Sequence, residues 1–162
     1  MHPLAKKAFS LQAAGKLEAS QETFATLLAE QPNDPLSHYY YASSLDRLGK
    51  ERQAVPHYEQ AIALGLSGDD LEGALLGLGS TYRVLGEYGK AEKTLSKGCS
   101  LFPNSKPLQV FLAMALYNNS KHSEAMEQLL HIIADTTNDT ALKSYEKAIR
   151  FYADKLDTTW DQ

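Results

Sequence analysis

Small and bulky apolar positions recur along this chain with a period of about 34 residues. Counted from a turn position in each unit, the spacing is 34, 37 and 34 residues, and this position is occupied in order by Gly15, Gly49, Gly86 and Ser120. A small residue lies seven positions before each turn and another lies five positions after it: Ala8, Ala42, Gly79 and Ala113, then Ser20, Ala54, Ala91 and Ala125. A bulky residue lies four positions before and nine positions after each turn: Leu11, Leu45, Tyr82 and Leu116, then Phe24, Tyr58, Leu95 and Leu129. Small side chains at helical spacing let antiparallel helices approach closely, so the pattern predicts successive helix pairs.

The predicted helix pairs follow one another from the N-terminus. Their ranges are 3–14 and 18–31, 36–48 and 51–64, 70–85 and 88–101, and 106–119 and 122–135. Pro3, Pro35 and Pro107 can each begin a helix, because the missing N–H costs nothing in the first turn. The extra residues of the second unit fall just before the fifth helix, which Asp69 or Asp70 is expected to cap.

A last helix is predicted over residues 140–157, followed by a short tail over 158–162. Apolar residues with helical spacing form one stripe that is expected to be buried: Ala141, Tyr145, Ala148 and Tyr152. Charged residues occupy the other side, which favours a polar capping helix that ends a repeat array in water. We therefore expect a single domain over residues 1–162, with repeats over about 1–34, 35–70, 71–105 and 106–139.

The third unit carries the most complete motif. Over residues 3–138 the chain resembles the tetratricopeptide repeat (TPR) family, on the third-unit residues Leu78-Gly79, Tyr82, Gly86, Ala91 and Pro103 and on partial matches in the other units. The resemblance implies an all-α fold, namely an α-solenoid of about four helix-turn-helix units with a C-terminal capping helix. The stretch 77–88 also resembles small stand-alone bacterial members of the family, which implies a homodimer.

The resemblance also implies a peptide-binding groove along the first helix of each pair. Transferred by repeat position, the expected contact residues are Phe9, Gln12, Tyr39, Ser43, Asp46, Arg47, Leu76, Ser80, Arg83, Val110, Met114, Tyr117 and Asn118. Tyrosine and arginine are frequent anchors of protein contacts, and methionine suits an adaptable surface. The family branch that binds chaperone tails holds a carboxylate with Lys and Asn, but Ala5 and Phe9 stand at those positions here, which disfavours such a role.

Three features of this surface allow two interpretations each. Tyr39 either faces the groove or packs against neighbouring helices. Arg47 and Arg83 either receive an acidic side chain or a C-terminal carboxylate, or pair with nearby acids and solvent. Trp160 either docks into a partner or a second protomer, or folds back on the last helix.

Composition narrows the choice of partners. The net charge of −4 and the pI of about 5.7 give no attraction to nucleic acid or to an anionic membrane. Cys99 is the one cysteine, which excludes an intramolecular disulfide. No signal peptide or membrane span is evident, so we expect a cytoplasmic protein.

Candidate chemistry is absent from the sequence. Gly77 and Gly79 lie inside a predicted helix rather than in a phosphate-binding loop. No two of the five histidines are three or four residues apart, so we expect no metal site and no cofactor. The sequence therefore predicts a non-enzymatic scaffold or adaptor that binds a peptide or helix in the groove and can self-associate. A peptide-sensing regulator that acts by sequestration is the alternative, and an enzyme is disfavoured.

Overall fold

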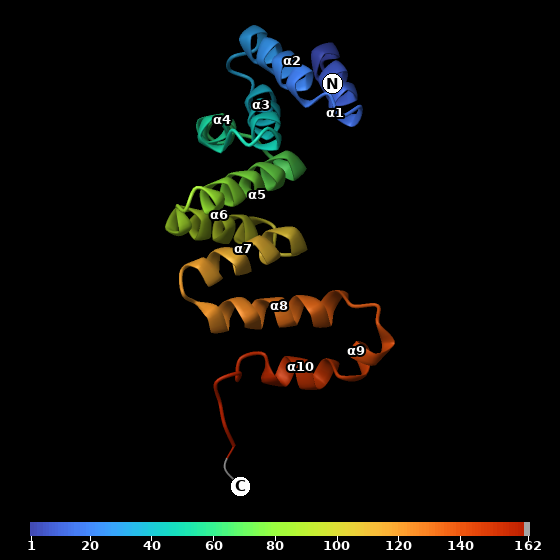
Figure 1. Cartoon of the computed structure of the whole chain (residues 1–162), viewed down its shortest axis with the longest axis vertical. Coiled ribbons are helices and arrows are strands. Elements are labelled where there is room, and N and C mark those ends of the chain that lie inside the picture. The colour runs from blue at the N-terminus through green and yellow to red at the C-terminus, as the bar shows by residue number, and fades with distance from the viewer. Residues whose placement is uncertain (161–162) are drawn as a thin grey trace. The chain divides into compact units, whose positions relative to one another are not determined.

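The computed structural model describes residues 1–160, and in this range it contains ten α-helices and no strand. The helices are α1 (Pro3–Ala13), α2 (Leu17–Glu30), α3 (Pro35–Arg47), α4 (Glu51–Ala63), α5 (Gly68–Val84), α6 (Tyr88–Leu101), α7 (Lys106–Asn118), α8 (His122–Thr136), α9 (Thr140–Ser144) and α10 (Glu146–Tyr152) (Figure 1). The predicted all-α class is confirmed. Helices α1 to α8 begin and end within two residues of their predicted bounds.

The chain divides into two compact units. The N-terminal unit, Met1–Glu87, contains α1 to α5, and the C-terminal unit begins at Tyr88 and contains α6 to α10. The division falls between the two helices of the predicted third repeat. Within each unit, helices that follow one another in the sequence pack together (α1 to α5, and α6 to α8), and α10 packs on α8.

The four turns share one backbone geometry. Gly15, Gly49 and Gly86 have φ of 73°, 68° and 78°, and Ser120 takes the same left-handed conformation at 61°. In each turn the next N–H donates to the carbonyl five residues earlier, as Lys16 does to Leu11 at 2.9 Å. These bonds close the first helix of each pair, so the predicted turn position is confirmed even where serine replaces glycine.

Small residues bring the helices of the N-terminal unit together. Ala8 and Ala54 are 0% exposed. The Ser20 hydroxyl donates to the carbonyl of Ala8 at 2.8 Å, which satisfies a polar group at a tightly packed position. On α5, a Cβ added to Gly77 would lie 2.6 Å from the Tyr58 hydroxyl, so the bare glycine backbone makes room for this ring.

The predicted cap of α5 is wrong. The helix begins earlier than expected, at Gly68, and its N-cap is Ser67, whose side chain makes no capping hydrogen bond. Asp69 and Asp70 lie in the first turn instead, where their negative charges interact favourably with the helix dipole.

The predicted helix over 140–157 differs most from the structure. It is divided at Tyr145 into α9 and α10, and neither helix buries a residue. The predicted buried stripe is wrong, since Tyr145 is 65% and Tyr152 48% exposed. The chain leaves the helical conformation at Tyr145, and α10 then packs on α8.

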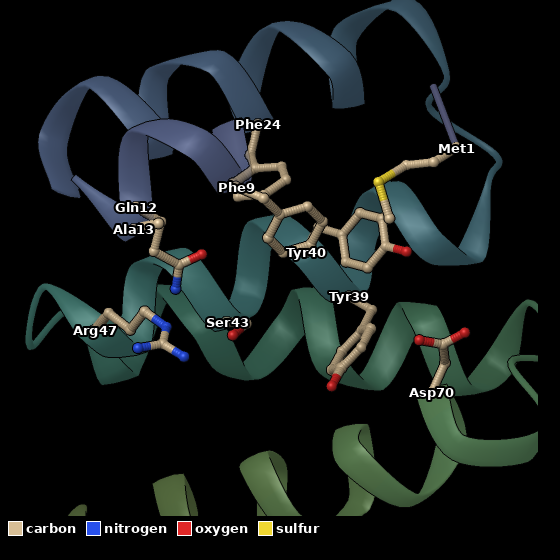
Figure 2. A pocket seen from close by; sticks show the side chains of 10 residues that line it. All are labelled: Met1, Phe9, Gln12, Ala13, Phe24, Tyr39, Tyr40, Ser43, Arg47 and Asp70. Atoms are coloured by element: carbon tan, nitrogen blue, oxygen red, sulfur yellow. The ribbon is translucent and has the colours of Figure 1, made fainter. Parts of the chain in front are cut away.

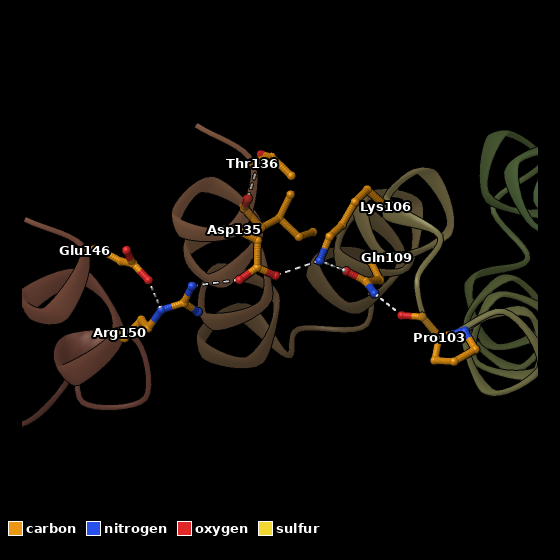
Figure 3. A network of polar contacts seen from close by, with 8 residues as sticks. Pro103, Lys106, Gln109, Asp135, Thr136, Glu146 and Arg150 are labelled. Carbon is orange, nitrogen blue, oxygen red and sulfur yellow. Dashed lines mark hydrogen bonds and ion pairs between the residues drawn. The ribbon is translucent and has the colours of Figure 1, made fainter. Parts of the chain in front are cut away.

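Ion pairs connect α10 to α8, and α8 to α7 (Figure 3). The Arg150 guanidinium donates to Asp135 at 2.8 Å and to Glu146 at 3.0 Å, and Lys106 donates to the other Asp135 oxygen at 2.6 Å. Trp160 lies against the rings of Phe151 and Tyr152, with centroid separations of 6.4 and 5.6 Å. The Trp160 ring therefore lies against α10, as one of the two interpretations predicted.

Candidate functional site

A cleft of about 630 Å³ opens in the N-terminal unit (Figure 2). It is lined by residues from α1, α2, α3 and α5 and by the N-terminal methionine: Met1, Phe9, Gln12, Ala13, Phe24, Tyr39, Tyr40, Ser43, Arg47 and Asp70. Five of the predicted groove residues therefore meet in one cavity: Phe9, Gln12, Tyr39, Ser43 and Arg47.

Aromatic rings form one wall of this cleft. Phe9 meets Phe24 and Tyr40 edge to face, with both centroid separations at 5.1 Å. Phe24 is 1% exposed and anchors the cluster, whereas Phe9 is 36% exposed and can be reached from solvent. A buried ring thus holds an accessible ring in place, which gives a preorganised apolar surface.

Tyr39 satisfies both interpretations made from the sequence. It lines the cleft, and its hydroxyl also packs against the backbone of α5 at Gly73, where an added Cβ would clash with the ring. Burial is the main cause that raises the pKa of Tyr39, Asp70 raises it further, and Arg47 opposes the shift. The phenol is therefore a neutral hydrogen-bonding group at physiological pH.

Charged groups lie at the two ends of the cleft (Figure 2). At one end, the Arg47 guanidinium donates to the side-chain oxygen of Gln12. The oxygen of the Gln12 amide must face Arg47, because a guanidinium can only donate hydrogen bonds. At the other end, the Asp70 carboxylate lies beyond Tyr39. Ser43 lies between the two, on α3.

The other predicted groove residues of this unit do not line the cleft. The Asp46 carboxylate accepts hydrogen bonds from Tyr58 at 2.8 Å and from Thr81 at 2.8 and 2.9 Å, which ties α3 to α4 and α5. Burial raises the pKa of Asp46, while the bonds from Thr81 and Tyr58 oppose the shift. Leu76, Ser80 and Arg83 are half-buried on α5, and the Arg83 Nε is buried with no hydrogen-bond partner among the described residues.

The predicted groove residues of the C-terminal unit lie on α7, and none of them lines the cleft of the N-terminal unit. Tyr117 is 62% and Met114 39% exposed, and Val110 is half-buried. The side-chain oxygen of Asn118 is buried without a hydrogen-bond partner within residues 1–160. These residues stay predicted contacts.

A second cleft, of about 460 Å³, lies in the C-terminal unit, and the contact positions transferred from the family did not predict it. Its lining includes Leu112, Leu116 and Ile132, with Glu124 and Glu127 beside them. The contact positions transferred from the family lie on the first helix of each pair, whereas five of the nine residues that line this cleft lie on α8, the second helix of its pair. Cys99 also lines it, and burial raises the pKa of its thiol, so that the group stays protonated.

The described residues, 1–160, contain neither a candidate membrane span nor a candidate metal site. Among their helices, none combines the length and the apolar character that a membrane span requires. Within the same residues, no three His, Cys, Asp or Glu side chains gather as a metal ion would need.

The repeats match a known protein family. The family model described as "Tetratrico peptide repeat" covers residues 35–156, more than half of the chain. The chain belongs to the tetratricopeptide repeat family. Members of this TPR family are in general non-enzymatic interaction modules.

Individual TPR proteins resemble this chain over most of its length. The Hsp70-Hsp90 organising protein of Plasmodium falciparum is 27% identical over 145 residues, which are 88% of this chain and 54% of that protein. This chain thus spans about half the length of that relative.

Solved structures show the same fold. YrrB, described as "a TPR protein with an unusual peptide-binding site", superposes with a TM-score of 0.72 at 18% identity, over 96% of this chain and 78% of that one. MamA residues 41 to the end, from Desulfovibrio magneticus, give a TM-score of 0.71 at 18% identity, over 98% and 93% of the two chains. At this identity the likeness supports the fold alone, and it confirms the predicted helical-repeat class.

Proposed function

We infer that this TPR chain binds an extended peptide segment of a partner protein in the cleft of its N-terminal unit. The observation that carries the proposal is the meeting of five contact residues, chosen by repeat position, in one cavity with an accessible aromatic wall. The peptide-binding site described for YrrB supports peptide binding by a chain of the same fold.

Each part of the cleft suits one part of a peptide. Phe9 and Tyr40 offer ring surface to an apolar side chain. The Tyr39 and Ser43 hydroxyls can bond main-chain amides or carbonyls. Arg47 presents a planar fork to a carboxylate.

The chaperone-linked relative does not by itself suggest the same ligand. Its name concerns Hsp70 and Hsp90, and it is longer than this chain. The Lys and Asn that the tail-binding branch would place in the first helix are Ala5 and Phe9 here, and Ala5 is 1% exposed. We therefore propose a different peptide for this cleft.

The test is to select peptides from a displayed random library with the full chain and to measure their affinity by fluorescence anisotropy. Phe9→Ala is expected to weaken the selected peptides about tenfold or more, because it removes the accessible ring of the wall. Tyr145→Ala is the matched control, since this ring is 65% exposed and lies in the other unit. Equal affinities for wild type and Phe9→Ala, with both folded by circular dichroism, would place the binding surface elsewhere.

Homodimerisation stays a prediction, and exposed rings at the C-terminal end favour it. Phe151 is 53% and Trp160 56% exposed. A light-scattering mass near two chains is expected, and a mass near one chain would contradict it. A peptide-sensing regulator would use the same cleft, so sequestration also stays a prediction.

A further inference from the structure

The cleft of the N-terminal unit is electrically bipolar. Arg47 and Asp70 stand at its two ends, with Tyr39 on the Asp70 side of the aromatic wall (Figure 2). Tyr39 interacts with both charges, unfavourably with Asp70 and favourably with Arg47 when its phenol ionises. The two charges therefore act across one continuous cavity.

Neither charge is neutralised within the described residues. Arg47 contacts the uncharged amide of Gln12, and in this part of the chain no ion pair involves Arg47 or Asp70. Arg47 is exposed and Asp70 is half-buried, so both can be reached by a ligand. A binding segment with the complementary charges would pair both groups.

Helix geometry gives the distance along α3 from Arg47 to Tyr39, and Asp70 lies beyond Tyr39, within reach of a side chain as long as that of Lys or Arg (Figure 2). Arg47 lies eight residues after Tyr39 on α3, and eight residues advance a helix by about 12 Å. An extended chain advances about 3.3 Å per residue, so roughly four peptide residues cover the same length. The aromatic wall lies between the two ends and faces the middle of such a segment.

Resting on the proposed function, we propose that the cleft selects a bipolar peptide segment. A carboxylate binds at Arg47 and Gln12, a Lys or Arg about four residues away binds at Asp70, and an apolar side chain between them packs on Phe9 and Tyr40. The carboxylate is an Asp or Glu side chain or the end of the chain, because both present the same group to a guanidinium.

The probes are fluorescein-labelled peptides of the form Asp-Ala-Leu-Ala-Lys with blocked ends, and their affinity is measured by anisotropy with the full chain. We expect this peptide to bind about tenfold more tightly than versions with Asn for Asp or Gln for Lys. Moving the Lys next to the Asp is expected to cause a similar loss. Because a free main-chain carboxylate exists only at the C-terminus, the two sources are told apart by Lys-Ala-Leu-Ala with an unblocked C-terminus and Lys-Ala-Leu-Ala-Asp with blocked ends, and failure of both carboxylate forms overturns the proposal.

Charge reversal in the protein gives the matching test. Arg47→Glu and Asp70→Lys are each expected to weaken the bipolar peptide about tenfold, and the double variant is expected to recover affinity because the peptide can bind in the reverse direction. Arg52→Glu and Asp69→Lys make the same charge changes at exposed positions outside the cleft lining, and they should leave the affinity unchanged.

The outcomes separate this proposal from the one on which it rests. Peptides that bind in a Phe9-dependent manner but with equal affinity for all charge patterns would overturn the bipolar selection and leave peptide binding in place. If the control variants Arg52→Glu and Asp69→Lys lost as much affinity as Arg47→Glu and Asp70→Lys, the loss would come from the overall charge of the unit. That result would also overturn the bipolar selection. Absence of any Phe9-dependent peptide binding would overturn both proposals.

Discussion

The first helix of the N-terminal unit and the last helix of the C-terminal unit are held by different interactions. On α1, Ala5 and Ala8 are 1% and 0% exposed and pack with Phe24 of α2. On α10 no residue is buried, and the helix is linked to α8 by the exposed pair of Arg150 and Asp135. Electrostatic screening by salt does not weaken apolar burial, whereas exposed ion pairs are weak and are screened, so α10 is expected to be the less stable of the two helices.

The clefts of the two units differ in the side chains that line them. The N-terminal cleft joins an aromatic wall to charges of both signs, whereas the C-terminal cleft combines Leu112, Leu116 and Ile132 with the acidic Glu124 and Glu127. The packing positions of the repeat are the same in both units. The surface positions are free to vary, so one scaffold can offer two unlike binding surfaces.

Phe24→Ala is expected to have the largest effect on stability. The ring is 1% exposed, and removing such a ring typically costs about 3–5 kcal/mol. Phe151→Ala on α10 is the matched change at a ring that is 53% exposed, and we expect it to stay within about 0.5 kcal/mol. Urea unfolding followed by circular dichroism measures both, and equal losses would contradict the comparison.

Gly77→Ala is expected to cost less, about 1–3 kcal/mol. Its new Cβ would lie 2.6–2.9 Å from Tyr58, whose buried ring is fixed by the hydrogen bond to Asp46. In the C-terminal unit a Cβ on Gly98 would meet the methyl ends of Leu108, which can move more easily, so Gly98→Ala should cost less. A larger loss for Gly98→Ala in urea unfolding would reverse this order.

The repeat pattern predicted the parts of the fold that depend on neighbouring helices. Turn positions and helix bounds follow from regular spacing, and five cleft residues follow from the contact positions that the family resemblance implies. Asp70 was not predicted in the cleft, because it lies in the irregular insertion and its position depends on where α5 begins. The break at Tyr145 was also missed, since the amphipathic pattern is continuous across it and Arg150 meets Asp135 from a distant part of the chain.

The histidine pair of His38 and His57 predicts a pH dependence of the N-terminal unit. Their Nδ1 atoms are 3.1 Å apart, which is a hydrogen-bonding distance. The centroids of the two rings are 5.3 Å apart. The pair was missed because it joins α3 to α4 rather than two positions of one helix. Burial lowers the pKa of His57, and the neighbouring His38 lowers it further.

This depressed pKa fixes the sign of the effect. Below the ordinary histidine pKa of about 6.5 the unfolded chain binds more protons than the folded one, so stability falls as the pH is lowered and is recovered as the pH rises. Urea midpoints between about pH 5 and pH 8 should therefore rise with pH, and they should rise less in His57→Gln. His131→Gln, on α8 of the other unit, is the control; an unchanged slope in His57→Gln would contradict the prediction.

Asp135→Asn is expected to have the smallest effect, confined to α10. Lys106 and Arg150 lower the pKa of Asp135 to about 2 through their hydrogen bonds, so the carboxylate is charged and joins α7, α8 and α10 at neutral pH (Figure 3). Asparagine keeps the shape but loses the charge, and α10 should then exchange its amide hydrogens faster while α1 is unaffected. Raising the salt concentration from about 0.05 M to about 1 M should have the same effect on wild type and little further effect on the variant, because the substitution and the salt remove the same attraction.

Hydrogen exchange followed by mass spectrometry measures the exchange rates of α10 and α1. Asp154→Asn is the control, because the Asp154 carboxylate pairs with the adjacent Lys155. The prediction is contradicted if α10 exchanges as slowly in Asp135→Asn, and in wild type at high salt, as it does in wild type at low salt. In that case α10 is held by half-buried apolar side chains such as Ile149, and both terminal helices depend on apolar contacts.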